Sequence, residues 1–265
     1  HRFEGRRPLG HRLADLPARG CVEEPALLGD VVEEDMRRWQ QLFVRPAHRP
    51  AQFPESGEQA DGEAGPPDLG QPVEPRRILQ QRAEGDLRRT DERGVTTLTL
   101  NRPNAFNALS ESLLIALQQE IDALSKCSKV RVVIISALGK AFCAGHDLRE
   151  MRAEPSLAYY QNLFAKCGQM MMSLQKLQVP VIAKVQGIAT AAGCQLVAQC
   201  DLAVASSDSK FAVSGVNLGL FCATPSVALS RNLSRKAAFE MLVTGDFISA
   251  TEALSKGLIN KVAEA

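Results

Sequence analysis

The sequence predicts an α/β fold, in which buried strands alternate with helices, over residues 76–265. The alternating, β-branched stretch at 95–100 and the apolar runs at 130–137 and 181–185 are typical of strands. Between the first two runs, Ser110 is a plausible N-cap for a helix that extends to about residue 125 and carries leucines at helical spacing. Strands separated by helices of this length need crossover connections, so we expect a largely parallel sheet.

Further elements follow the same alternation. Gly245 and Gly257 are predicted to end two of the helices, because glycine readily adopts the left-handed conformation at a helix C-terminus. The remaining expected helices are 147–151, a long one after Pro155, 193–200, 226–230, 236–244 and 250–256, and the remaining strands are 202–205 and 211–213.

The first 75 residues differ sharply in composition from the rest. Every lysine lies at or after Lys126, and ten of the fourteen prolines precede residue 91. We interpret residues 1–75 as a disordered or non-native extension, with 31–44 as the one stretch that could have a helical period. A mitochondrial presequence is the alternative, but presequences are poor in acids, whereas acidic residues here are as frequent as arginine. The first residue is His, which suggests a fragment or an over-extended reading frame.

Charge and cysteine usage exclude several classes of function. The net charge of +1 gives no electrostatic reason to expect nucleic-acid binding, and no apolar run is long enough for a membrane span. The cysteines show no C-x-x-C spacing, so we expect no metal site and a reducing compartment. They lie at positions 21, 127, 143, 167, 194, 200 and 222.

Two loops of small residues each follow a predicted strand. AFCAGHDL spans 141–148, and the loop at 187–193 leads into a helix. Small residues let a ligand approach several backbone N–H groups, which can bind a phosphate or an oxyanion that forms during a reaction. Periodicity alone does not separate a doubly wound sheet from other α/β architectures.

Four motifs in order, NRPNAFNALS, FCAGHDL, ATAAGCQLVAQCDLAVAS and FAVSGVNLGLFCATP, resemble the crotonase superfamily of enoyl-CoA hydratases and isomerases. The resemblance covers about residues 93–265 and implies a ClpP/crotonase spiral of repeated β-β-α units, with the C-terminal helical part missing. It further implies an acyl-CoA thioester as ligand, coenzyme A as part of that substrate with no separate cofactor, and a homotrimer or dimer of trimers. The compartment would be the cytoplasm in a bacterium and the mitochondrial matrix in a eukaryote.

Matching the family motifs assigns roles within this sequence. The N–H groups of Ala144 and Ala192 are expected to form the oxyanion hole that holds the thioester oxygen. The two glutamates of the hydratases correspond here to Gln195 and Gly215. Residues expected to contact the substrate are Arg102, Ala105, Gly145, His146, Asp147 and Gly193.

The substitutions at Gln195 and Gly215 put ordinary hydration in doubt, since glutamine cannot accept a proton and glycine has no side chain. The position used by dienoyl isomerases matches Ala223, and Asp201 is interpreted as a structural cap. Three functions therefore remain open: a hydratase-like lyase or isomerase of fatty-acid metabolism, another oxyanion-hole reaction such as hydrolysis or decarboxylation, and a non-catalytic CoA-binding subunit. His146 is expected to be a loop histidine bonded to backbone, and Cys143, Cys194 and Cys222 are expected to be packing residues.

Overall fold

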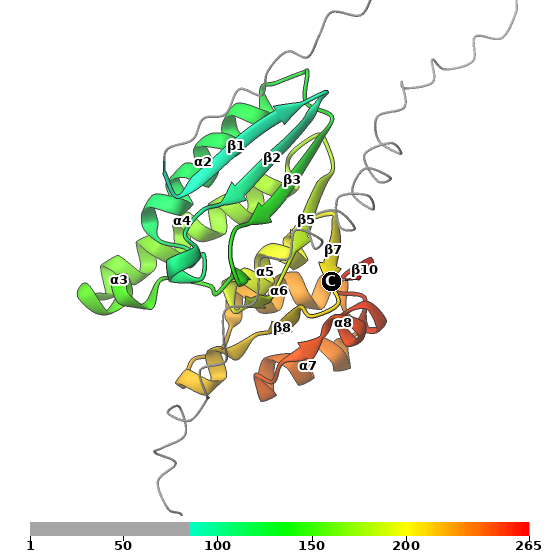
Figure 1. Cartoon of the computed structure of the whole chain (residues 1–265). Helices are drawn as coiled ribbons and strands as arrows, with labels where there is room; N and C mark the ends of the chain where they lie inside the picture. The colour runs from blue at the N-terminus through cyan, green and yellow to red at the C-terminus, as the bar shows by residue number, and fades with distance from the viewer. Residues whose placement is uncertain (1–84, 265) are drawn as a thin grey trace, which may run out of the picture.

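The computed structural model describes residues 85–264, so the extension predicted for residues 1–75 lies outside the described residues. A six-stranded sheet with the order β1-β2-β3-β5-β7-β10 forms the larger of two sheets (Figure 1). All neighbouring strands in it are parallel except the β1–β2 pair. The strands are β1 (Leu87–Glu92), β2 (Val95–Leu100), β3 (Val132–Ala137), β5 (Val181–Val185), β7 (Leu202–Ser206) and β10 (Lys261–Ala263).

The second sheet is built from short strands that follow the long ones in the chain. Its order is β4 (Ala141–Cys143), β6 (Ile188–Thr190), β8 (Lys210–Ala212) and β9 (Ile248–Ser249). The sequence β3-β4, β5-β6 and β7-β8, with helices after each pair, makes three successive β-β-α turns. The predicted α/β spiral of crotonase type is therefore confirmed, and the doubly wound alternative is excluded.

The helices begin and end where capping chemistry places them. Ser110 caps α2 by accepting a hydrogen bond from the N–H of Leu113, as predicted. The helix expected at 226–230 begins earlier, at Ala223, because Pro225 is tolerated in the first turn of a helix. The helices are α2 (Glu111–Ser125), α3 (Leu148–Ala153), α4 (Leu157–Gln175), α5 (Ala192–Gln199), α6 (Ala223–Asn232), α7 (Arg235–Thr244) and α8 (Ala250–Lys256), with the 3₁₀ turns η1 (Pro103–Ala105) and η2 (Ser214–Leu218).

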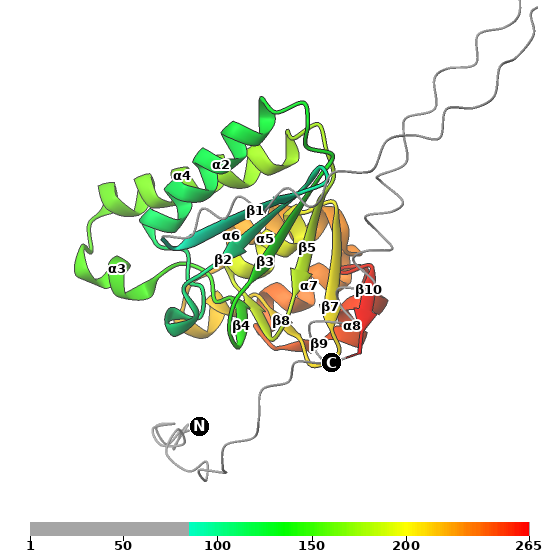
Figure 2. The ribbon, with the colours of Figure 1, turned by 45° about the horizontal axis from the view of Figure 1, so that its top comes forward.

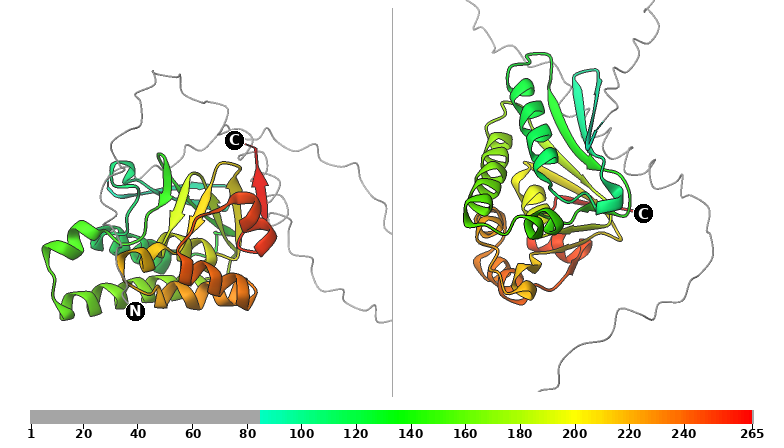
Figure 3. Two further views of the ribbon diagram at one scale, coloured as in Figure 1. Left: turned by 90° about the horizontal axis from the view of Figure 1, so that it is seen from below. Right: turned by 90° about the vertical axis from the view of Figure 1, so that its left-hand side faces the viewer.

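The main core lies between the sheets and the helices. Helices α2 and α4 pack against each other along one face of the large sheet, and α5 lies inside, beside α6 (Figures 2 and 3). Seven of the eight residues of α5 are buried, which makes this helix a central element of the fold. None of the helices within residues 85–264 has the length and apolar character needed to cross a membrane.

Candidate functional site

The two small-residue loops lie against each other, backbone to backbone. Strand β4 pairs with β6, which places Cys143 beside Ala189. A Cβ atom added to Gly193 would lie 2.1 Å from the carbonyl oxygen of Cys143, and one added to Gly145 would lie 3.2 Å from the amide nitrogen of Ala192. Glycine is therefore required at both positions, because any side chain would separate the loops.

The second loop turns sharply into helix α5. Ala191 has φ 51° and ψ −121°, a conformation that non-glycine residues rarely adopt, and its N–H donates to the carbonyl of Ala212 at 3.0 Å. Helix α5 begins at the next residue, so the amide of Ala192 is one of the first-turn N–H groups that have no partner within the helix. This arrangement fits the role predicted for Ala192.

The amide of Ala144 does not fit its predicted role. It donates to the carbonyl of Phe106 at 3.0 Å, so its hydrogen already has an acceptor. His146, two residues after Ala144, forms a parallel bridge with Leu109. The backbone of Leu109 accepts a hydrogen bond from the N–H of Asp147 and donates one to the carbonyl of Gly145. Because successive backbone groups of an extended segment point to opposite sides, the N–H of His146 points away from Leu109. No acceptor for it is recorded among the described residues.

A buried asparagine that the sequence analysis did not select holds the first loop in place. Asn107 is 0% exposed, and its Nδ2 donates to the carbonyls of Leu138 and Ala141 at 2.8 and 2.7 Å. Its Oδ1 accepts from the N–H of Arg102 at 2.8 Å. The φ angle of 52° at this residue is one that asparagine tolerates better than most residues. The only sequence signal for this role was that Asn107 lies within the motif NRPNAFNALS.

Arg102 and Asp147, both predicted to contact substrate, contact each other. Arg102 Nη2 lies 3.0 Å from Asp147 Oδ2, and its Nη1 donates to the carbonyl of Ala108. Burial raises the pKa of Asp147, but the hydrogen bonds from Arg102 and from two backbone amides together lower it by more. The net shift of this pKa is therefore downward. Asp147 also caps α3, with Oδ1 accepting from the N–H of Arg149 at 3.0 Å. In this structure both side chains fix the first loop.

The side chain of His146 is more isolated than expected. Its ring packs edge-on against Phe164 of α4, with ring centroids 4.9 Å apart. Its Nε2 atom is buried and has no hydrogen-bond partner within residues 85–264, so the expectation of a backbone-bonded ring is wrong at this atom. Burial lowers the pKa of His146 to about 4, which keeps the imidazole neutral at pH 7.

Gln195 lies one turn into α5. The residue is only 5% exposed, and its Oε1 is buried with no hydrogen-bond partner in the described part of the chain. A buried, unsatisfied polar atom in a native structure calls for an explanation, and a ligand or water that supplies a donor is the simplest one. The neighbouring Cys194 is fully buried, and burial, with a smaller contribution from Cys222, raises the pKa of its thiol to about 12.

Gly215 lies in η2 beside a sulfur atom. A Cβ atom added to this glycine would lie 2.5 Å from Cys222 Sγ and 2.9 Å from the carbonyl oxygen of Leu220. The thiol of Cys222 therefore occupies the space into which a side chain at position 215 would project. Burial raises the pKa of this thiol, although the backbone N–H of Gly215 opposes the shift. The interpretation of Cys222 and Cys194 as neutral packing residues agrees with these contacts.

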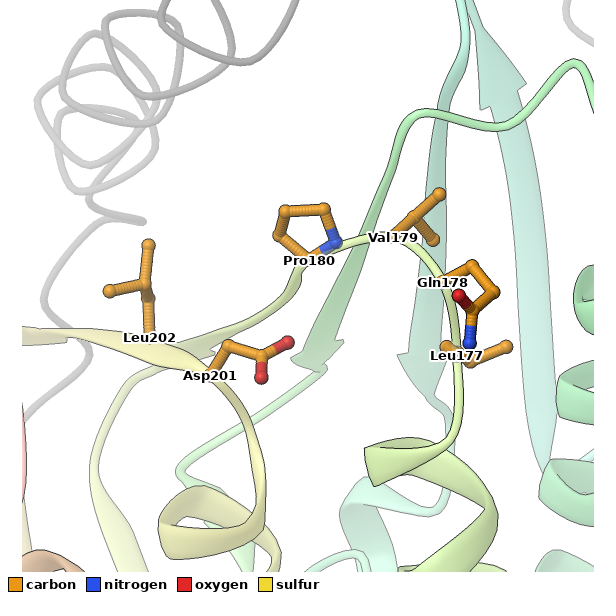
Figure 4. A pocket seen from close by; sticks show the side chains of 6 residues that line it. All are labelled: Leu177, Gln178, Val179, Pro180, Asp201 and Leu202. Carbon is orange, nitrogen blue, oxygen red and sulfur yellow. The ribbon is translucent and has the colours of Figure 1, made fainter.

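Two other residues singled out from the sequence lie elsewhere. Ala105 ends η1 and is partly buried. Asp201 accepts a hydrogen bond from the N–H of Val181 at 2.7 Å, so it ties the starts of β5 and β7 together, as a structural cap does. It lines a shallow hollow of about 500 Å³ (Figure 4) at the opposite end of these strands from the two loops. The hollow therefore belongs to a different part of the molecule from the predicted site.

Comparison with known proteins agrees with this architecture. The family model described as enoyl-CoA hydratase/isomerase matches residues 90–265. Enoyl-CoA hydratase domain-containing protein 3, mitochondrial, from Xenopus laevis is 52% identical over 171 residues, which are 64% of this chain and 58% of the frog protein. The Homo sapiens protein of the same name is 49% identical over 184 residues, covering 68% of this chain and 61% of its own length. The chain thus spans less than two thirds of these relatives.

Solved structures give the same result. A crystal structure of an enoyl-CoA hydratase from Mycobacterium smegmatis superposes with a TM-score of 0.67 at 64% identity, covering 68% of this chain and 71% of that one. The crystal structure of human enoyl-CoA hydratase domain-containing protein 3 gives a TM-score of 0.66 at 47% identity, with the same coverage. The matched motifs, the three β-β-α turns and these likenesses together show that the chain belongs to the enoyl-CoA hydratase/isomerase family and has the crotonase fold.

Proposed function

We propose that this chain binds an acyl-CoA thioester and holds its oxygen with the backbone N–H groups of His146 and Ala192. The observation that carries the proposal is the contact between the two loops, which brings Gly145 against the amide of Ala192. Neither proposed donor has an acceptor among residues 85–264, whereas the amide of Ala144 donates to the carbonyl of Phe106. His146 thus replaces Ala144 as the donor from the first loop.

The proposed chemistry rests on charge that develops at the thioester oxygen. When the α-carbon loses a proton, or when a nucleophile adds at the β-carbon, electrons move onto this oxygen and form an enolate. Amides fixed in position stabilise this charge, and one such donor typically lowers the barrier by about 2.7–4 kcal/mol. Because the donors are backbone groups, side-chain substitutions elsewhere in the site leave this contribution intact.

Acid and base catalysis of hydration is the part we propose to be lost. Gln195 can orient a ligand or a water by hydrogen bonding but cannot take up its proton. At Gly215 the space is filled by the thiol of Cys222, which stays protonated at neutral pH because its pKa is raised. We therefore expect Gln195 to bind a polar atom of the acyl group or a water, which would satisfy its buried Oε1.

The test compares binding with turnover in the full-length protein, because this chain spans only part of its relatives. Calorimetry with acetoacetyl-CoA is expected to show binding, while hydration of crotonyl-CoA is expected to be slow or undetectable. Each missing acid or base typically costs 10²–10⁴-fold in rate. Rapid hydration by the unmodified protein would refute the proposal, and absence of binding would refute the site itself.

The same experiment separates the remaining alternatives. Decarboxylation of a malonyl-type thioester or hydrolysis of the thioester needs the oxyanion donors but not the two glutamates, so turnover of either substrate would identify an enzyme of that kind. Binding without turnover of any of these thioesters would favour a CoA-binding subunit. In each case the protein would act in acyl-CoA or fatty-acid metabolism.

Assembly and location are also proposals. We propose a homotrimer or a dimer of trimers, supported by large apolar side chains that the described residues leave exposed near η2 and α7; sedimentation of the full-length protein tests it. These side chains are Leu218, Phe221, Phe239, Val243 and Phe247. The frog and human relatives carry "mitochondrial" in their names, which supports the matrix for a eukaryotic source. For a bacterial source the proposed compartment is the cytoplasm.

A further inference from the structure

The guanidinium of Arg102 spans the point where the first loop meets the segment before α2. At this point Leu109 and His146 form their parallel bridge. Arg102 Nη1 donates to the carbonyl of Ala108, one residue before Leu109, at 2.5 Å. Its Nη2 lies 3.0 Å from Oδ2 of Asp147, one residue after His146. One side chain therefore holds both backbone segments of the bridge.

The position of this guanidinium is itself fixed by its surroundings. The backbone N–H of Arg102 donates to Oδ1 of the buried Asn107 at 2.8 Å, and its carbonyl accepts from the N–H of Asn107 at 2.9 Å. The Nε atom lies 3.5 Å from Oδ2 of Asp86, and the Arg102 side chain is 19% exposed. A guanidinium presents its N–H groups in a rigid planar fork, so two acceptors set its orientation. These contacts direct the fork toward the two backbone segments.

The proposed donor from the first loop, the N–H of His146, depends on the orientation of one peptide plane. The carbonyl of Gly145 and the N–H of His146 belong to the same planar unit and point in opposite directions. The N–H of Leu109 donates to this carbonyl at 2.7 Å, so the bond turns the N–H of His146 away from Leu109. Gly145 has φ 90° and no side chain that would restrict rotation of the plane. The direction of the donor therefore depends on the position of Leu109, whose segment Arg102 holds.

We infer that Arg102 positions the backbone N–H of His146 for the thioester oxygen. It does so by joining the carbonyl of Ala108 to the carboxylate of Asp147, an arrangement here called the Arg102 clamp. This role rests on the proposed function and adds to it a residue that acts through other residues. It differs from the substrate contact expected from the sequence. A contact with a phosphate would strengthen binding of coenzyme A itself, whereas the clamp affects only a ligand that carries a thioester oxygen.

Calorimetry and infrared spectroscopy on the full-length protein separate the two roles, with acetoacetyl-CoA and free coenzyme A as ligands. Arg102→Lys keeps the charge but loses the planar fork that reaches two acceptors. It is expected to raise the Kd for acetoacetyl-CoA by at least about 10-fold, because a misplacement of about 1 Å can cost about 10²-fold. The Kd for free coenzyme A should not change. Hydrogen bonds to the thioester oxygen lower the stretching frequency of its isotope-labelled carbonyl, and this downward shift on binding should shrink in the variant.

Asp147→Asn tests the other end of the Arg102 clamp with little change in shape. Asparagine keeps an oxygen that can cap α3 but loses the charge that pairs with Arg102. We expect the same loss of infrared shift, and Asp147→Asn combined with Arg102→Lys should lose little more than either change alone, because both remove one interaction. Arg89→Lys is the matched control, since Arg89 is 21% exposed and also pairs with two partners, Asp91 and Glu120, outside the two loops. It should change neither the Kd values nor the infrared shift.

Three results with the variants would overturn the role of Arg102 alone. An unchanged Kd and infrared shift in both Arg102→Lys and Asp147→Asn would show that the donor does not need the clamp. Equal weakening of coenzyme A and acetoacetyl-CoA binding would show that Arg102 contacts the coenzyme. Lower stability in urea with an unchanged infrared shift would show a purely structural role. Failure of the proposed function is recognised separately, because the parent protein would then bind acetoacetyl-CoA without the downward carbonyl shift, or not at all.

Discussion

Introducing carboxylates at Gln195 and Gly215, the two positions matched to the hydratase glutamates, is the sharpest test of the proposed site, and the structure predicts that Gly215 cannot simply be replaced. In Gln195→Glu the new side chain has nearly the shape of the old one, and burial would raise its pKa toward the neutral range in which a general base works well. In Gly215→Glu the new Cβ would meet Cys222 Sγ at 2.5 Å and the oxygen of Leu220 at 2.9 Å. Both contacts are shorter than real Cβ atoms tolerate.

The expected magnitudes follow from these contacts. Overpacking of this kind typically costs 1–3 kcal/mol, so Gly215→Glu alone is expected to lower the free energy of unfolding by about that amount. Cys222→Ala removes the sulfur contact but not the contact with the Leu220 carbonyl, and should recover part of the loss. Gln195→Glu alone is expected to raise the rate of crotonyl-CoA hydration modestly. The triple variant, which combines Gln195→Glu, Gly215→Glu and Cys222→Ala, should raise this rate more, by up to about 10²–10⁴-fold for each group that acts as acid or base.

The assay is crotonyl-CoA hydration followed by loss of enoyl absorbance in full-length variants, paired with urea unfolding of each variant. Cys222→Ala alone is the control, because it removes the thiol without adding a carboxylate. If Gly215→Glu were as stable as the parent protein, the packing of Cys222 against position 215 would be wrong. If the triple variant folded and bound acetoacetyl-CoA but showed no gain in hydration, the assignment of these two positions would be wrong.

Three further predictions test the loops. Gly193→Ala should prevent stable folding, since its Cβ would lie 2.1 Å from a backbone oxygen. Gly168→Ala in α4 meets no atom of the described residues within 4 Å, so it should raise the free energy of unfolding, measured with urea, by about 0.5–1 kcal/mol. Asn107→Ala should cost at least about 2 kcal/mol and weaken acyl-CoA binding in calorimetry, because it leaves the buried carbonyl of Ala141 and the part-buried carbonyl of Leu138 unpaired; Asn101→Ala, which removes an exposed bond to Gly85, should change little. The pKa of His146 is lowered from 6.5 to about 4 in the folded chain, so the unfolded chain binds a proton that the folded chain does not bind between these pH values. The free energy of unfolding should therefore fall by about 3 kcal/mol between pH 6.5 and 4. Urea titration at each pH measures this loss, and the His146→Leu variant should not show it.

The long strands could be predicted from the sequence because their signal is local. The stretches at 95–100 and 181–185 coincide with β2 and β5, because β2 is rich in β-branched residues that alternate with leucine and β5 is a mostly apolar, buried run. The short strands β4, β6 and β9 have only two or three residues, too few for any periodic signal, and they are strands only because the spiral brings them side by side. Strand β1, with the sequence LRRTDE, is an edge strand whose charged residues hide its pairing.

The site was predictable as a pair of loops but not as a set of atoms. In AFCAGHDL, small residues indicate close backbone approach, yet three successive amides meet that description equally well. The choice depends on Leu109 and Phe106, which are distant from the loop in the sequence. In the folded chain, the N–H of Leu109 donates to the carbonyl of Gly145, and the carbonyl of Phe106 accepts from the amide of Ala144. Which N–H remains for a ligand is therefore decided by tertiary contacts that no local pattern encodes.

The packing at position 215 also bears on what kind of protein this is. A hydratase that had merely lost a carboxylate at this position would leave a void the size of the missing side chain, and such a void costs stability. Here the sulfur of Cys222 fills that space and accepts the N–H of Gly215. Gln195 differs, because its Oε1 is buried and has no partner among the described residues, although an unsatisfied buried atom costs stability. In the proposed acyl site, position 215 is thus closed by packing, while Gln195 keeps an unpaired hydrogen-bond acceptor among the described residues. A ligand held by the two proposed backbone donors could supply a hydrogen-bond donor to the Oε1 of Gln195, so we expect substitution of Gln195 to change binding and chemistry together.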